Sequence, residues 1–247
     1  MSNGEAASSD QARALDAAAG RLGISQDALM AIASWQCARL ALDILGKRAA
    51  AGPIAVLAGK GNNGGDALGC ARHLAAWGRQ VRSVTLGEVA ESGTSYARQV
   101  QAAQAAGVEL RPVGHDADAT LDWALGPAGL VVDGLLGTGS VGAARGLVAR
   151  VVRHINASAA LVLAIDVPSG LDATTGIARG DCVRADATVM LAVAKLGCLA
   201  PSAPVGELWL ADIGVPSGAY SEVGLEPPSW SGGSLRQFQP ASERDTS

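Results

Sequence analysis

The sequence predicts an α/β protein with a mostly parallel central sheet covered by helices. Short apolar runs recur along the chain and are typical of strands buried on both faces. Between them lie alanine-rich segments with charged residues on one side, which is the pattern of helices packed on a sheet. Strands that alternate with helices in this way are joined by right-handed crossovers, and the 247 residues, 49% of them hydrophobic, are enough to build the core.

The elements are predicted in the following order. Two helices precede the first strand, at Ser9–Arg21 and Gln26–Gly46, and the second is apolar enough to pack on the sheet or against a partner subunit. The strands are predicted in the apolar runs that begin at Pro53, Val81, Leu130, Ala160, Ala187 and Glu207. The helices between them are predicted over residues 66–77, 92–106 and 146–157.

Composition changes toward the end of the chain. From Leu225 onward the sequence is rich in serine, proline and charge and poor in aliphatic residues, so it buries too little surface to offset the entropy of ordering it. We therefore expect one domain over residues 1–218 and a mobile tail or linker over 219–247.

Charge and cysteine usage exclude several classes of protein. The net charge is −4 and the basic residues are spread along the chain, so there is no stripe for binding nucleic acid. The N-terminus lacks a basic segment followed by an apolar run, and no later stretch approaches the ~20 apolar residues of a membrane span, which predicts a cytoplasmic protein without membrane contact. Cys37, Cys70, Cys182 and Cys198 show no metal-ligand spacing and are expected to be buried thiols.

Three acidic residues follow strands of the predicted sheet. Asp66, Asp133 and Asp166 each lie in a short glycine-rich stretch at the end of an apolar run. An isolated aspartate in such a place is usually a helix cap or a turn former. Three such loops at one edge of a sheet instead favour a shared pocket, because ligands bind at the carboxyl ends of parallel strands. The further polar residues of these loops are Asn62, Asn63 and Ser169.

The first of these loops resembles a dinucleotide-binding fingerprint without matching it fully. Gly59, Gly61 and Gly64 have the G-x-G-x-x-G spacing, and Glu88 could contact a ribose at the end of the next strand. Asp66, however, would lie where a dehydrogenase binds the pyrophosphate. The glycines and the helix start after Gly64 still favour a phosphate-bearing small molecule, held in a different pose.

The loops also offer the oxygen ligands that a hard cation prefers. Carboxylate, carboxamide and hydroxyl groups gather there without histidine or cysteine. We expect a monovalent or divalent cation between Asn63, Asp133 and Ser169, and the residues alone leave the ion unnamed.

Five motifs in order resemble the NAD(P)H-hydrate epimerase family. They are GKGNNGGDALGCARHL, VVDGLLGTG, AIDVPSGLD, ADATVMLAVAKLG and DIGVP, and the likeness extends from Leu29 to Pro216. The resemblance implies a Rossmann-like, three-layer αβα fold, often a homodimer, that acts on hydrated NADH or NADPH. It implies potassium at Asn63, Asp133 and Ser169. It also implies substrate binding by Asn62, Asn63, Gly64, Gly65, Asp66, Gly137, Thr138, Gly139, Ser140, Val141, Gly142, Ala143 and Asp166.

The chemistry of such a substrate indicates what the site must contain. The ring nitrogen beside C6 can expel the C6 hydroxyl, and water can then return to either face of the resulting cation. This requires an acid, a base and anionic groups. Asp133 is the first candidate for acid/base catalysis. Lys195 is a second if apolar surroundings lower its pKa, although a surface lysine at a strand end is an equally good interpretation.

The sequence departs from the family pattern in its N-terminal helix and directly after the segment GNNGGD. The usual LMExAG reads LMAIAS, with Ala31 and Ser34 at the changed positions, and Ala67 stands where glycine is common. Ser140 and Ala143 replace larger residues. The final segment LRQFQPASERDTS resembles the linker to a dehydratase domain in bifunctional relatives, so a fused or separate dehydratase is an expected partner.

Two alternatives to the epimerase remain open from the sequence. They are a non-catalytic nucleotide-binding protein of the same fold and, less favoured, an NAD(P)-dependent dehydrogenase.

Overall fold

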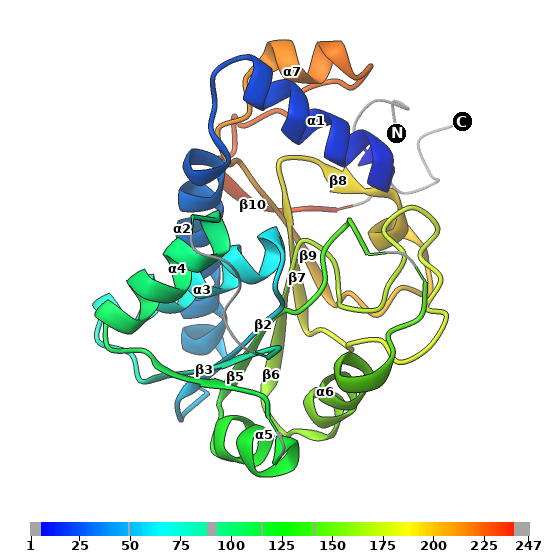
Figure 1. The fold of residues 1–247 in the computed structure, drawn as a ribbon. Coiled ribbons are helices and arrows are strands. Elements are labelled where there is room, and N and C mark those ends of the chain that lie inside the picture. Colours follow the sequence, from blue (N-terminus) through cyan, green and yellow to red (C-terminus); the bar gives the residue numbers. More distant parts are fainter. Residues whose placement is uncertain (1–5, 49, 88–92, 115, 141, 240–247) are drawn as a thin grey trace.

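A mostly parallel sheet divides the molecule into layers, with helices on both of its faces (Figure 1). The computed structural model describes residues 6–239 except 49, 88–92, 115 and 141. Within that part of the chain the main sheet has eight strands in the order β10-β9-β7-β6-β5-β2-β3-β4, and all of its pairings are parallel apart from that of β10 with β9. The predicted α/β class and three-layer αβα arrangement are confirmed.

The strands are short and the helices that connect them are longer. The strands are β1 (Ala6–Ala7), β2 (Ile54–Ala58), β3 (Val81–Thr85), β4 (Glu109–Pro112), β5 (Leu130–Gly134), β6 (Leu161–Ile165), β7 (Ala187–Leu191), β8 (Ala194–Lys195), β9 (Glu207–Ala211) and β10 (Leu235–Gln237). The helices are α1 (Ser9–Arg21), α2 (Gln26–Lys47), α3 (Asn62–Ala76), α4 (Ser95–Ala105), α5 (Ala117–Leu125), α6 (Gly146–Ala157), the 3₁₀ turn η1 (Leu196–Leu199) and α7 (Ser217–Glu222).

Alternation along the strands separates two apolar cores. In β2, Ile54 and Val56 pack with residues of α2, α3 and α4, whereas Ala55 and Leu57 pack with residues of α5 and α6. Side chains of a strand point to opposite faces in turn, and burial of both faces explains why the run is apolar throughout. Figure 1 shows the two groups of helices on opposite sides of the sheet.

The order of the strands creates a crevice in the middle of the sheet. From β2 the chain adds β3 and β4 on one side, then returns to add β5, β6, β7 and β9 on the other side. The loops after β2 and β5 therefore diverge from neighbouring strands, which is where open α/β sheets bind ligands. The three glycine-rich loops lie side by side at this place because β6, β5 and β2 are adjacent.

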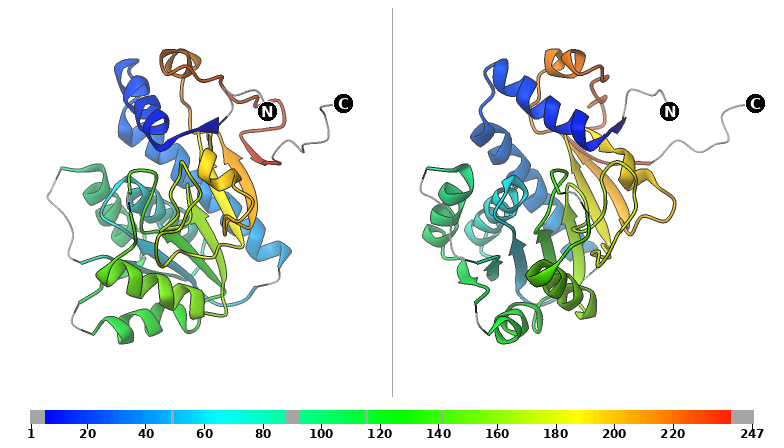
Figure 2. Two further views of the ribbon diagram at one scale, coloured as in Figure 1. Left: turned by 90° about the vertical axis from the view of Figure 1, so that its right-hand side faces the viewer. Right: turned by 45° about the vertical axis from the view of Figure 1, so that its right-hand side comes forward.

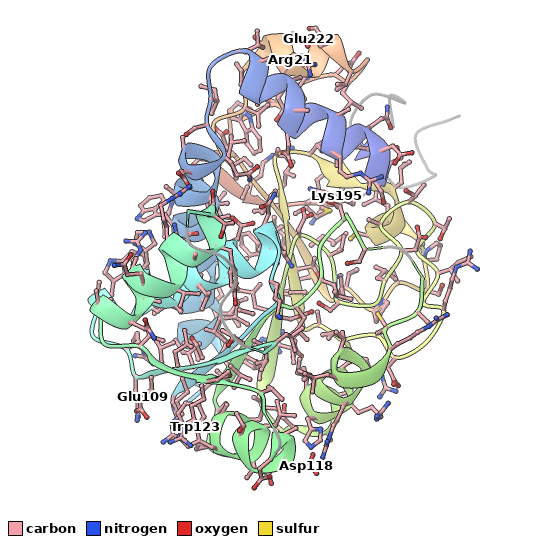
Figure 3. All side chains as sticks on the ribbon, in the orientation of Figure 1. Arg21, Glu109, Asp118, Trp123, Lys195 and Glu222 are labelled. Carbon is pink, nitrogen blue, oxygen red and sulfur yellow. The ribbon has the colours of Figure 1, made fainter. Side chains whose placement is uncertain are left out.

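The N-terminal segment covers that end of the sheet. β1 pairs in parallel with β8, with Ala7 opposite Lys195, and α1 then runs across the ends of the strands toward α7 (Figure 2). Arg21 at the end of α1 forms an ion pair of 2.7 Å with Glu222 of α7 (Figure 3). Thus residues that precede the first strand of the main sheet form part of its ligand-binding end.

Among the described residues, helix α2 is the exception to the expectation that no stretch is apolar and long enough to span a membrane. By length and composition it is apolar enough to cross a membrane, contrary to that expectation. Of its most apolar window, 61% is buried inside the fold, and residues such as Leu40 and Ala41 are fully covered. Its apolarity is therefore accounted for by packing, chiefly against α3.

Several boundaries match the prediction and others differ for physical reasons. α1 and α6 have the predicted bounds, whereas α3 begins at Asn62 and not at Asp66. The segment Asn-Asn-Gly-Gly has low helix propensity, so a loop was predicted there. In the structure, tertiary packing holds this segment in the first turn of α3. Strand β4 was not predicted because its sequence, ELRP, is charged and mostly exposed.

The predicted tail is wrong for residues 219–239, and residues 240–247 lie outside the described part. β10 pairs antiparallel with β9, placing Leu235 opposite Ala211, and Phe238 donates its backbone N–H to the carbonyl of Leu208 at 2.7 Å. The Phe238 ring is 8% exposed and packs in a cluster with Leu208 and Leu210. A polar, serine-rich sequence can be ordered when one aromatic anchor and an unpaired strand edge are available.

We predict that Phe238→Ala lowers the free energy of unfolding by about 3 kcal/mol, because it removes a buried ring and leaves a cavity. Gln237→Ala is the matched control, since Gln237 is exposed on the same strand, and it should change stability by less than about 0.5 kcal/mol. Urea unfolding followed by tryptophan fluorescence measures both. Equal midpoints for the two variants would mean that the segment contributes nothing to the fold.

Candidate functional site

A cavity of about 490 Å³ opens at the carboxyl ends of the central strands. Its walls come from α1, α2, the start of α3, the loops after β5 and β6, and the segment from Leu191 to Lys195. This volume falls in the usual range of small-molecule sites. The site predicted from three loops is thus a single hollow, closed on one side by the N-terminal helices.

Most of the predicted substrate-binding residues line this cavity. Those that do are Asn62, Asn63, Asp66, Gly137, Thr138, Gly139, Ser140 and Asp166. Gly64, Gly65, Gly142 and Ala143 do not line it, and Val141 and Glu88 lie outside the described residues. The loop from Leu135 to Ser140 therefore forms the wall itself, while its continuation at Gly142 turns away with a φ of +91°.

The first turn of α3 faces the cavity with its backbone donors uncapped. Gly61 is the N-cap and provides no side-chain hydrogen bond to the helix, and Gly61 and Asn62 line the cavity. Free N–H groups at a helix start attract anions. Gly64 is required by packing, because a Cβ there would collide with the carbonyl oxygen of Gly59, and a Cβ at Gly65 would collide with Met30.

A hydrogen-bond network beneath the cavity ties the three loops together. The carboxylate of Asp133 accepts the hydroxyl of Ser169 at 2.6 Å and its backbone N–H at 2.8 Å, and it also accepts the N–H of Leu135 at 3.2 Å. The hydroxyl of Ser169 in turn accepts the N–H of Leu136 at 2.9 Å. Asn63 Nδ2 donates to the carbonyl of Leu136 at 2.8 Å. Residues of α3 and of the loops after β5 and β6 therefore meet at one point.

The same network contains an oxygen without a partner. Asn63 Oδ1 is buried and accepts no hydrogen bond, which is costly unless another group occupies that position. Leu136 links the Asn63 side chain to Ser169, which in turn donates to Asp133, and the oxygens of these three side chains are ligands that suit a hard cation. No group of three histidine, cysteine, aspartate or glutamate side chains placed to hold a metal occurs among the described residues. The three predicted cation ligands therefore belong to one hydrogen-bond network, and their oxygens are of the kind that a hard cation prefers.

Asp133 is more deeply buried than the sequence indicated. It is 0% exposed and does not line the cavity, and burial raises its pKa to about 6, although its hydrogen bonds to Ser169 and Leu135 lower it. Because a bound molecule cannot reach this carboxylate directly, its position favours holding the loops or a cation over the predicted acid/base role.

Asp166 and Lys195 form a buried ion pair on the cavity wall. Lys195 Nζ lies 2.5 Å from Asp166 Oδ1 and also donates to the carbonyl of Leu191 at 2.6 Å. Lys195 is 2% exposed, so the interpretation as a surface lysine is wrong. Asp166 has a φ of +68°, a left-handed conformation that is rare outside glycine and is commonly found at functional sites. Figure 3 shows Lys195 beneath α1, at the edge of the ligand-binding end.

Two further carboxyl groups share this cavity. Asp66 is 8% exposed, and burial raises its pKa well above the ordinary value, with a further rise from the charge of Asp166. Burial thus shifts the titration of Asp66 toward the protonated carboxyl, against the opposing effect of the Lys195 charge on its pKa. Asp16 on α1 is the functional candidate that the sequence analysis missed, and burial raises its pKa to about 6. Asp16 is exposed and lies next to the apolar face formed by Ala12, Leu15 and Ala19, which is the signal that the sequence offered.

The changed positions of the N-terminal helix have different surroundings. Ala31 is exposed, whereas Ser34 is fully buried and its hydroxyl has no hydrogen-bond partner. Ser34 packs against Gly69 of α3, where a Cβ would collide with the serine hydroxyl. The serine therefore fits because the facing residue is glycine.

Comparisons with known proteins agree with this architecture. The chain is 37% identical over 199 residues to the NAD(P)H-hydrate epimerase of Dehalogenimonas lykanthroporepellens, covering 80% of this chain and 77% of that protein. It is 41% identical over 207 residues to the bifunctional NAD(P)H-hydrate repair enzyme Nnr of Pyrobaculum aerophilum, covering 82% of this chain and 40% of that protein. The crystal structure of yeast YNL200c has the same fold, with a TM-score of 0.82 at 21% identity over 94% of this chain and 99% of that one.

Family membership follows from the extent of the match. Residues 26–197 match the family described as YjeF-related protein N-terminus. This range contains the start of α3, both aspartates that follow β5 and β6, and Lys195, and it begins after α1. The chain therefore belongs to the YjeF-related protein N-terminus family.

Proposed function

We propose that this protein is an epimerase that interconverts the R and S forms of hydrated NADH or NADPH at C6 of the nicotinamide ring, in nicotinamide cofactor repair. The observation that carries the proposal is the cavity in which the buried carboxyl group of Asp66 and the ion pair of Asp166 and Lys195 lie near the uncapped start of α3. Relatives with the name NAD(P)H-hydrate epimerase at 37% identity support it.

The two kinds of group in the cavity suit the two ends of the substrate. The free N–H groups at the start of α3 would bind the diphosphate, because they are donors and carry the positive end of the helix dipole. The hydrated ring would then lie toward Asp66, Asp166 and Lys195. In this pose Asp66 does not compete with the diphosphate, since it lies in the second turn of α3 and not at its first donors.

The reaction needs no oxidant or reductant. The nitrogen lone pair expels the C6 hydroxyl while an acid protonates that hydroxyl. The hydroxyl departs as water, and the ring becomes an iminium-like cation. Asp66 is suited to be the acid, because its pKa is raised. Asp166 is suited to stabilise the cation and, through its ion pair, to be kept in place by Lys195. Addition of water to the other face completes the inversion.

We also propose that potassium binds to Asn63, Asp133 and Ser169. The unpartnered Asn63 Oδ1 supports this assignment, because a cation would satisfy it. A bound cation would supply positive charge beneath the loops that hold Asp166 and Gly137. In this arrangement Asp133 serves the loops and the ion, and the acid/base work passes to residues that line the cavity.

The alternatives fit the cavity less well. A dehydrogenase would bind an undamaged cofactor tightly and transfer hydride, whereas the relatives reported above carry the names of an epimerase and a repair enzyme. A non-catalytic nucleotide-binding protein would share the start of α3 but has no need for a buried carboxyl group with a raised pKa on the cavity wall. A dehydratase partner, fused or separate, remains part of the proposal, because this chain spans 40% of the bifunctional relatives.

The first test is whether the purified protein accelerates equilibration of the separated C6 epimers of hydrated NADH, followed by chromatography in potassium buffer. Asp66→Asn should reduce kcat by about 10²-fold or more, as expected for loss of a general acid. Its folding should persist, because asparagine resembles the neutral carboxyl. Asp122→Asn, an exposed aspartate of α5, is the control and should retain the wild-type rate.

Two results would contradict the proposal in different ways. A wild-type protein that binds the epimers without accelerating their equilibration is a non-catalytic binder. An Asp66→Asn variant with the wild-type rate would leave the epimerase activity in place but remove Asp66 from it.

Potassium binding should appear as a stability effect. Replacing 100 mM tetramethylammonium chloride by 100 mM potassium chloride should raise the Tm of the wild-type protein. The free energy of unfolding should rise by about 2.7 kcal/mol if the potassium concentration is a hundred times Kd. Asn63→Ala should abolish this salt-specific shift, whatever its own Tm. An equal shift in the variant would show that potassium does not bind there.

Finally, we propose that two copies of the chain associate through the outward face of α2. Ile32 and Trp35 are each 40% exposed on that face, and Arg39 stacks over the Trp35 ring at 4.8 Å. Exposed apolar side chains at helical spacing are typical of interfaces. Sedimentation equilibrium should give a dimer for the wild type and a monomer for Trp35→Glu. Trp77→Glu, at a site with 39% exposure, should remain a dimer; a monomeric wild type would refute the proposal.

A further inference from the structure

Helix α1 presents an acidic residue, Asp16, to the cavity, beside its buried face. Ala12, Leu15 and Ala19 face the core, and Asp16 borders that face because it follows Ala12 by four residues and precedes Ala19 by three. Asp16 itself stays exposed, so its carboxyl group is accessible from the cavity. Ala12, Leu15 and Asp16 all line the cavity.

The surroundings of Asp16 link it electrostatically to the proposed reacting groups. Its side chain is open to the cavity, yet enough protein surrounds it that desolvation raises its pKa to about 6, while Lys195 lowers the pKa and Asp166 raises it. Its charge also contributes to raising the pKa of Asp66. The remaining charged groups that line the cavity are Arg13 and Lys60, and Tyr220 of α7 is the other titratable neighbour affected by Asp16.

The position of α1 gives Asp16 a different approach to the cavity from that of the other carboxyl groups. Asp66 and Asp166 project from α3 and from the loop after β6, at the ends of the main sheet. Asp16 projects from the helix that crosses above those ends (Figure 1). A flat ring between them would have Asp66 and Asp166 on one face and Asp16 on the other.

Inversion at C6 requires proton transfer on both faces of the ring. The hydroxyl leaves from one face and water adds to the other, so an acid or base confined to one face supports loss and return on that face alone. This requirement comes from the stereochemistry of the proposed function, on which the inference depends.

We propose that Asp16 is the proton-transfer group for the face of the ring turned toward α1, and that Asp66 with Asp166 serves the opposite face. In one direction, Asp66 gives its proton to the departing hydroxyl, the C6–O bond breaks, and the nitrogen lone pair forms the C=N bond. Water then adds from the α1 side and gives a proton to the Asp16 carboxylate. The reverse direction uses protonated Asp16 as the acid and ionised Asp66 as the base. Exchange with solvent through the open cavity restores both groups after each turnover.

The test compares oxygen exchange with inversion in water enriched in oxygen-18. Each C6 epimer is incubated separately with the protein, and mass spectrometry after chromatographic separation gives the label in the starting epimer and in its product. In Asp16→Asn, we expect inversion to fall at least 10-fold. Label should continue to enter the epimer whose hydroxyl faces Asp66 at a rate within threefold of wild type, while exchange into the other epimer falls together with inversion.

The control separates this role from a structural one. Glu222→Gln breaks the ion pair that links α1 to α7 and leaves Asp16 in place, so it should lower exchange and inversion by the same small factor, if at all. The inference is overturned if Asp16→Asn inverts at the wild-type rate, or if exchange into both epimers falls in parallel with inversion. A wild-type protein that accelerates neither process refutes the proposed function itself.

Discussion

A buried carboxylate at the end of the central strand is the constraint on which the ligand-binding end depends. Asp133 is fully covered, and its hydrogen bonds reach both its own loop and Ser169 in the next one. The hydroxyl of Ser169 accepts the backbone N–H of Leu136, and the carbonyl of Leu136 accepts the side-chain amide of Asn63 at the start of α3. Three segments far apart in sequence are thereby fixed to one another, which positions Asp66 and Asp166 without either of them taking part in the network.

The sequence was sufficient for the elements that are determined locally. α1 and α6 were predicted with their observed bounds because their apolar periodicity ends at clear turn signals, and strands buried on both faces stand out as continuous apolar runs. Elements determined by distant contacts were not predicted. β10 exists because the edge of β9 and the pocket for Phe238 are available, and the first turn of α3 exists because Gly64 fits against Gly59.

The site shows the same division. Motifs on the three loops identified Asn63, Asp66 and Asp166 as neighbours, because strand ends in a parallel sheet converge. The depth of each residue could not be read in this way. Asp133 lies near the end of β5 and Asp166 directly after the adjacent β6, in similar sequences, yet the first lies beneath the cavity and the second on its wall. Asp16 was overlooked because nothing in the order of residues tells that α1 returns to the ends of the strands.

The pairing of β1 with β8 has a consequence for the order in which the protein is made. Ala6 and Ala7 are synthesised before every strand of the main sheet, but their partners are Ala194 and Lys195. The central strands β2, β5 and β6 can pair as soon as residue 165 has been synthesised, whereas the N-terminal strand has no partner until residue 195 follows. During that interval α1 lacks its final anchor and the ligand-binding end stays uncovered. The nascent chain can therefore form the centre of its main sheet before the N-terminal strand gains its partner.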